Sequence, residues 1–217
     1  MNSHAPAWEF IRQGQYEKDK ITMERLEQQI KFIIEIDKLK QVARQTYLTD
    51  ASRCENSVEH SWHLAVMAMV LSEHANDSDI DMIRVIKMVL VHDIVEIDAG
   101  DTFLYDEEHS ESKIDREEAA ADRLFSLLPE DQTKEFRELW DEFEARETKD
   151  AKFAYALDRF QPMLHNVITK GKAWQQHGIK KSQVIKKNSP MQEGSESLWE
   201  YISDLLDYAV EEGYLSE

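Results

Sequence analysis

The sequence predicts an all-α protein, a single compact bundle of about seven to nine helices. Apolar residues recur three and four positions apart over most of the chain, which is the period of an amphipathic helix. The 217 residues include only six Gly and four Pro, too few to punctuate many strands and hairpins. No segment alternates apolar and polar residues as a half-buried strand does. A chain of this length can bury a sizeable core in one domain.

The first half of the chain predicts three helices. Residues 1–18 are polar and are expected to form a loosely ordered lead-in to one domain over residues 19–217. The elements expected next are a helix over 21–47, a break over 49–57, a helix over 58–75 with Ser57 as its N-cap, and a helix over 80–97 that ends near Gly100.

The second half predicts further helices after an acidic loop. In order, the sequence indicates a loop over 98–112, helices over 113–128 and 130–145 with Pro129 between them, a helix over 149–169 capped by Thr148 and kinked or split at Pro162, a short helix over 172–177, a looser region to Gly194, and a closing helix over 197–212.

Charge and composition limit the partners. The formal net charge is −18, and no basic patch or stripe is evident, so we expect neither a nucleic-acid polymer nor an anionic membrane as a partner. A small phosphate ester stays compatible with this charge if a cation and a few Arg or Lys residues reverse the local field. Cys54 is the only cysteine, which excludes an internal disulfide and a thiolate zinc cluster. Without a signal-peptide pattern or an apolar stretch near ~20 residues, the chain is predicted to be cytoplasmic.

One stretch places polar residues inside an apolar run. In "VLVHDIVEIDAGDTF", residues 89–103, His92 and Asp93 lie between aliphatic side chains. Burying a carboxylate there costs several kcal/mol unless something compensates. Glu96 follows at helical spacing and shares a face with both residues. A divalent cation bound by His92 and Asp93 would compensate, although a hydrogen-bonded pair in the core explains the doublet equally well.

Two other helices offer inward-facing polar residues. His60 in "EHSWHLA" lies on the same face as Leu64, and Asp158 in "AYALDRFQPML" lies on a mostly buried face. The alternative for Asp158 is an ion pair with Arg159 or a nearby Lys. A single ion would nevertheless satisfy His60, Asp158 and the doublet together, whereas each would be costly alone.

The arrangement His60, then His92–Asp93, then a distant Asp158 resembles the H…HD…D pattern of the HD-domain metal-dependent phosphohydrolases. The segments "LKQVARQTYL", "SRCENSVEHSWHLA", "VHDIVEIDAGDT" and "ALDRFQP" are similar to the branch that includes the bacterial 5'-deoxynucleotidase. The resemblance covers roughly residues 30–210. It implies an all-α fold and a homodimer.

The resemblance also implies roles for individual residues. His60, His92, Asp93 and Asp158 would bind one divalent metal ion, with Mn, Co, Fe, Zn, Ni and Mg all compatible with these ligands. Asp93 would also take part in catalysis with Glu96, which would orient or deprotonate the attacking water. An arginine before the first ligand helix would bind the substrate phosphate, and Arg44 and Arg53 are the two candidates.

The reaction that this implies is hydrolysis of a small phosphate ester, foremost a (deoxy)ribonucleoside 5'-monophosphate to nucleoside and phosphate. Two alternatives stay open. One is an HD hydrolase acting on a nucleoside polyphosphate or a cyclic dinucleotide. The other is a regulatory module in which the metal only stabilises the fold.

Overall fold

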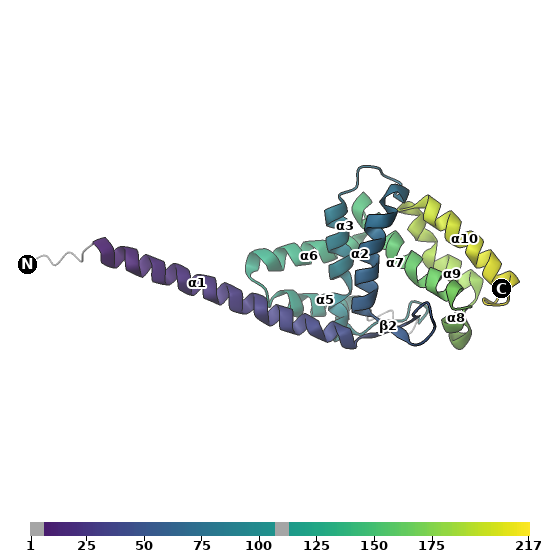
Figure 1. The fold of residues 1–217 in the computed structure, drawn as a ribbon, viewed down its shortest axis with the longest axis horizontal. Helices are drawn as coiled ribbons and strands as arrows, with labels where there is room; N and C mark the ends of the chain where they lie inside the picture. Colours follow the sequence, from purple (N-terminus) through teal and green to yellow (C-terminus); the bar gives the residue numbers. More distant parts are fainter. Residues whose placement is uncertain (1–6, 107–112) are drawn as a thin grey trace, which may run out of the picture.

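A computed structural model describes residues 7–106 and 113–217, with side chains from Lys20 onward, and shows a helical bundle with one long helix extending from it (Figure 1). The all-α prediction is confirmed. The described helices are α1 (Ala7–Ile36), α2 (Ser57–Leu71), α3 (Met82–Val91), α4 (Glu96–Ala99), α5 (Lys113–Phe125), α6 (Glu130–Ala145), α7 (Lys149–Ile168), α8 (Lys172–His177), α9 (Lys181–Asn188) and α10 (Glu196–Glu211). Short 3₁₀ turns join some of them: η1 (Asp37–Gln41), η2 (Ser72–His74), η3 (His92–Val95) and η4 (Ser189–Glu193).

Helix α7 is the central element of the core. Its first turn is capped as predicted, because the Thr148 side chain accepts a hydrogen bond from the backbone N–H of Ala151. Helices α2, α3, α6 and α10 pack around it (Figure 1). Buried apolar residues such as Phe153, Leu157 and Phe160 fill the contacts, so a polar residue on α7 that points inward meets several other helices.

The prediction that the first helix extends to residue 47 is wrong, because its last residues form part of a small sheet. Residues 43–47 form strand β1 (Ala43–Tyr47), which pairs antiparallel with β2 (Cys54–Asn56) instead of extending the helix to 47. Thr46 and Tyr47 suit a strand, and the turn formers that follow let the chain fold back on itself. The N-cap of α2 is Asn56 rather than Ser57: its side chain accepts from the Glu59 N–H, and the Glu59 carboxylate accepts from the Asn56 N–H.

The predicted continuous helix over 80–97 is also wrong. Helix α3 ends at Val91, and His92–Val95 form the 3₁₀ turn η3 before the short α4. Gly100, with φ of 76°, ends α4 as expected. Helices often tighten to 3₁₀ geometry near their ends, and here the tighter turn carries both residues of the polar doublet.

Several other boundaries differ from those expected. Helix α1 begins at Ala7, inside the segment expected to be loosely ordered, while residues 1–6 and 107–112 lie outside the described residues. The region before Gly194 holds α9 and η4 instead of a loose segment. Helix α7 continues through Pro162 without splitting, since Pro removes only its own N–H bond and neighbouring contacts hold the helix. Among the described residues, no helix is both long and apolar enough to cross a bilayer.

Candidate metal centre

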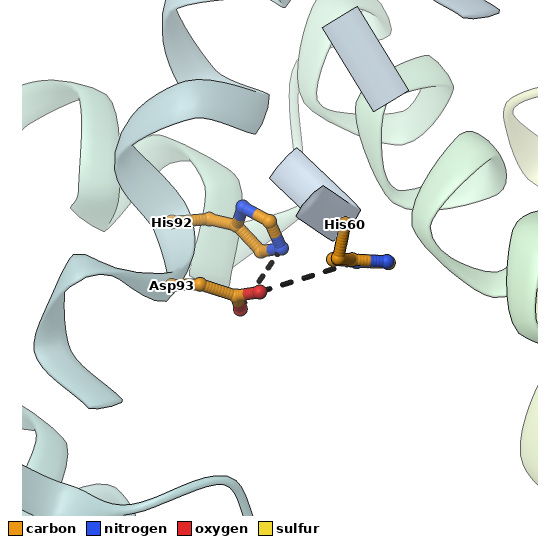
Figure 2. A group of neighbouring side chains, drawn as sticks. All are labelled: His60, His92 and Asp93. Atoms are coloured by element: carbon orange, nitrogen blue, oxygen red, sulfur yellow. Dashed lines mark ion pairs between the residues drawn. The ribbon is translucent and has the colours of Figure 1, made fainter. Parts of the chain in front are cut away.

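Three of the four predicted ligands form one tight group. The ligand atoms of His60, His92 and Asp93 lie within 4.8 Å of one another, and all three residues are buried. Figure 2 shows the Asp93 carboxylate facing both imidazoles, with its Oδ1 3.0 Å from His92 Nε2 and its Oδ2 4.0 Å from His60 Nε2. Helix α2 supplies His60, and the turn η3 supplies the other two residues.

Asp158 of α7 contacts both histidines of this group. Its Oδ1 lies 2.9 Å from His60 Nε2 and 3.7 Å from His92 Nε2. Its Oδ2 accepts a hydrogen bond from Nε of Arg159 at 3.0 Å. The ion pair with Arg159 and the contact with the histidines therefore exist together, one on each carboxylate oxygen.

The donor set suits a divalent cation. The Val89 carbonyl lies 2.9 Å from His92 Nδ1, so Nδ1–H donates to it and Nε2 is left to face the carboxylates. That buried Nε2 has no hydrogen-bond partner among the described residues. Burial alone lowers the pKa of His92, but the charges of Asp93 and Asp158 outweigh it and raise the pKa to about 10. The group therefore attracts positive charge, as two imidazoles and two carboxylates do around a metal ion.

Sequence comparison identifies the family. Residues 36–199 match the family model of the HD domain. The chain is a member of the HD-domain family. Membership implies a divalent metal ion, and the His–His–Asp group of this HD domain is able to bind one.

Known relatives extend the comparison. The HD domain is 35% identical over 136 residues to the 5'-deoxynucleotidase HDDC2 of Homo sapiens, a match that covers 62% of this chain and 65% of the relative. The chain thus spans just under two thirds of that relative's length. Among solved structures, a predicted metal-dependent phosphohydrolase from Magnetospirillum magnetotacticum is 53% identical, with a TM-score of 0.85 over 89% of this chain and 96% of that one. A hypothetical protein from Pyrococcus furiosus, 23% identical with a TM-score of 0.56 over 81% of this chain and 98% of that one, shares the fold.

Glu96 lies beside the four candidate ligands of the HD domain. It is buried at the start of α4, and Oγ of Ser57 donates a hydrogen bond of 2.6 Å to its Oε2. Its Oε1 lies 3.8 Å from Nη1 of Arg44. Burial raises the pKa of Glu96 well above its usual value, and the nearby charge of Asp93 raises it further. Its position beside the candidate ligands makes this carboxyl group a candidate for proton transfer.

The structure separates the two candidate arginines. Arg44, on β1, lines the cavity at the candidate metal centre, and its Nη1 donates to Asp93 Oδ2 at 2.8 Å. Burial opposes its charge, but Asp93, Glu96 and Asp101 together raise its pKa above the usual value. Arg53 does not line this cavity and instead pairs with Glu59, its Nη2 2.6 Å from Oε1.

The sequence did not single out two acidic residues near the candidate metal centre, Asp101 and Glu55. Asp101 lines the cavity, with its Oδ1 4.0 Å from Arg44 Nη1, and burial raises its pKa. Asp101 directly follows Gly100, whose positive φ ends α4, and residue spacing did not show that the chain would then bring Asp101 toward the centre. Glu55 of β2 is 2% exposed and contacts both Arg44 and His60. In the sequence, Glu55 is only an isolated acidic residue within the segment 49–57, which was expected to be a break between helices.

The cavity beside these residues has a volume of about 240 Å³. Its lining includes five residues of or beside the candidate metal centre: His92, Asp93, Asp158, Glu96 and Arg44. The lining also includes basic side chains (Lys113, Arg159, Lys187) and aromatic ones (Phe103, Tyr105, Trp174). The cavity therefore combines candidate cation-binding residues with aromatic side chains that can contact an organic group.

Proposed function

We propose that this HD domain is a metal-dependent phosphohydrolase that cleaves a small phosphate ester, foremost a deoxyribonucleoside 5'-monophosphate, to an alcohol and phosphate. The observation that carries the proposal is the convergence of His60, His92, Asp93 and Asp158 beside a cavity, which is lined by the last three of these residues and by Glu96 and Arg44. The similarity to a 5'-deoxynucleotidase and to a predicted metal-dependent phosphohydrolase supports the same reaction class.

The four converging residues would hold the divalent ion through two imidazole nitrogens and two carboxylates. Such an ion supplies positive charge for the phosphoryl oxygens and makes nearby water more acidic. The nitrogen and oxygen ligands suit Mn, Co, Fe, Zn, Ni and Mg, so the metal's identity needs a measurement.

Glu96 and Arg44 would act on the substrate side. Glu96, fixed through one oxygen by Ser57, has its other oxygen available to orient water and take its proton. Arg44 would bind the phosphate and offset its charge, since a guanidinium matches phosphate oxygens in shape and charge. Asp93 would contribute as a ligand and by holding Arg44 in place.

The cavity favours a monophosphate over larger substrates. A volume of about 240 Å³ lies just below the ~300–1,000 Å³ of typical ligand pockets, and a polyphosphate or a cyclic dinucleotide would need more space and more cationic contacts. A purely structural metal would not require Glu96 and Arg44 to line a cavity.

We also propose a homodimer formed through α1. Five large aliphatic side chains on this helix are 45–66% exposed: Met23, Leu26, Ile30, Ile33 and Ile34. They share one face, separate from the face on which Phe32 packs against Phe136. Together they expose on the order of 500 Å² of apolar surface, which is enough to form much of a dimer interface.

Two further expectations stay predictions: the cytoplasmic location of the protein and the start of its single domain at residue 19.

A substrate panel tests the proposed reaction. Protein stripped of metal is reloaded with Mn²⁺, Co²⁺ or Mg²⁺ and incubated with nucleoside mono-, di- and triphosphates and cyclic dinucleotides. Released phosphate is measured, and the nucleotide products are separated by chromatography because opening a cyclic dinucleotide releases no phosphate. Phosphate from monophosphates alone is the expected result. Activity confined to larger nucleotides would shift the substrate class, and no activity from protein that retains metal would indicate a regulatory module.

A further inference from the structure

Glu55 is a buried carboxylate next to the candidate metal centre that does not line the cavity. It lies on β2, which pairs antiparallel with β1, the strand that carries Arg44, with an irregular register between the pairs Ala43–Asn56 and Tyr47–Cys54. The same residue therefore neighbours the proposed phosphate-binding arginine and, through its side chain, the ligand His60.

Hydrogen-bond polarity links Glu55 to His60 through Gln161 of α7. Gln161 Nε2 donates to Glu55 Oε2 at 2.8 Å, and Gln161 Oε1 lies 3.3 Å from His60 Nδ1. A carboxylate can only accept, so the amide must turn its NH₂ toward Glu55 and its oxygen toward His60. The oxygen in turn accepts only from a protonated Nδ1, which leaves His60 Nε2 for the side that faces Asp158 and Asp93.

The second carboxylate oxygen of Glu55 faces two cationic or donor groups. Its Oε1 lies 3.5 Å from His60 Nδ1 and 3.7 Å from Arg44 Nε. Both Oε1 and that Nε are buried and without a hydrogen-bond partner among the described residues, so the attraction between their opposite charges offsets part of the cost of burying each. The Glu55 carboxylate therefore lies beside Arg44 Nε, while Arg44 Nη1 donates a hydrogen bond to Asp93.

We propose that Glu55 is a positioning residue with two functions. Through Gln161 it fixes His60 with the proton on Nδ1 and Nε2 available to a metal ion, and directly it holds the guanidinium of Arg44 toward the cavity. The proposal rests on the metal site and the phosphate-binding arginine proposed above. Metal-binding histidines commonly depend on such an acceptor at the second ring nitrogen, and losing it weakens metal binding about 10- to 100-fold.

Exchanging the side chains at positions 55 and 161 tests both proposed functions of Glu55. Mn²⁺ affinity is measured by competition with a chelator, and the affinity of inorganic phosphate is measured on Mn²⁺-saturated protein. Glu55→Gln is expected to weaken Mn²⁺ binding about 10- to 100-fold and to weaken phosphate binding as well. In the double variant Glu55→Gln with Gln161→Glu, the glutamine at 55 donates to the glutamate at 161, which accepts from His60 Nδ1. Mn²⁺ affinity should then recover, while phosphate affinity should stay low because Arg44 Nε no longer faces a carboxylate.

A matched control separates positioning from stability. Glu142→Gln breaks a partly buried carboxylate–arginine pair with Arg84, outside the cavity. It should lower the melting temperature and leave both dissociation constants unchanged. Wild-type affinities retained in Glu55→Gln, or Mn²⁺ affinity not restored in the double variant, would overturn the role of Glu55 alone. A wild-type protein unable to retain Mn²⁺ would instead overturn the proposed function and this inference with it.

Discussion

Arg44 and Arg53 carry the same side chain nine residues apart, yet the fold gives them opposite surroundings. The Arg44 side chain is 11% exposed among four carboxylates, whereas that of Arg53 is 55% exposed and paired with one. Its place in the cavity lining makes Arg44 the arginine able to contact an incoming phosphate, and a divalent ion at the candidate metal centre would offset the charge of the surrounding acids. Arg53 instead donates a hydrogen bond to Glu59 in the first turn of α2.

Arg44→Lys therefore tests the phosphate contact while keeping the positive charge among the acids. We expect KM to rise roughly 10- to 100-fold, because a hydrogen bond to a charged group contributes about 1.5–3 kcal/mol. Steady-state kinetics with a monophosphate substrate measure this, and Arg53→Lys is the control that should leave KM unchanged. An equal effect of both substitutions would remove Arg44 from the substrate site.

Glu96→Gln separates chemistry from metal binding. Glutamine keeps the shape and can still accept the Ser57 hydrogen bond but cannot take a proton at neutral pH. We expect kcat to fall about 10²- to 10⁴-fold with metal content unchanged. His92→Ala, by comparison, should lose both metal and turnover. A Glu96→Gln enzyme that keeps wild-type kcat would show that another group handles the proton.

The H…HD…D residues were predictable because each is a polar side chain in an apolar helical pattern. Burial without compensation is visible in sequence, as for Asp93 and Asp158. Glu55 and Asp101 were not predictable in this way. The contacts of Glu55 depend on a long-range strand pairing, and those of Asp101 depend on the direction that the chain takes after the expected helix end at Gly100; residue spacing encodes neither.

At the scale of elements, local sequence predicted the helices well and their ends less well. The Thr148 cap, the start of α6 after Pro129 and the short α8 follow from local signals. The strand at residues 43–47 does not, because its partner β2 supplies the hydrogen bonds that favour it over a continued helix. The 3₁₀ turn at residues 92–95 likewise depends on packing around the polar doublet.

The capping box of α2 holds the helix that presents His60. Asn56→Ala removes the acceptor for the Glu59 N–H and should lower the free energy of unfolding by about 1 kcal/mol. Urea denaturation of metal-free protein measures it. Glu73→Ala, an exposed substitution beyond the end of α2, is the control and should be nearly neutral. A change below a few tenths of a kcal/mol for Asn56→Ala would mean that α2 is fixed by packing alone.

At the scale of the whole molecule, α1 extends from the bundle with its apolar face uncovered by the described residues (Figure 1). The double substitution Ile30→Glu with Ile33→Glu should convert the proposed dimer to a monomer, because charges on this face cannot be buried against a second copy. Light scattering at micromolar concentration measures the mass. Ile114→Glu, at an exposed site on α5, should leave the dimer intact. A dimer that survives the α1 substitutions would place the interface elsewhere.

The metal should also stabilise the entire fold, since its ligands come from α2, η3 and α7. Free ion at 100 times its dissociation constant would add about 2.7 kcal/mol to the free energy of unfolding. Chelation should therefore lower the melting temperature reversibly, as scanning calorimetry would show. Unchanged melting after complete metal removal would mean that the folded protein holds no ion.

The most direct test is the anomalous scattering from a crystal of the protein grown with Mn²⁺. The account predicts one strong anomalous peak within bonding distance of His60, His92, Asp93 and Asp158 together. A metal-saturated crystal with no peak at these four residues, or with its peak elsewhere, would contradict it.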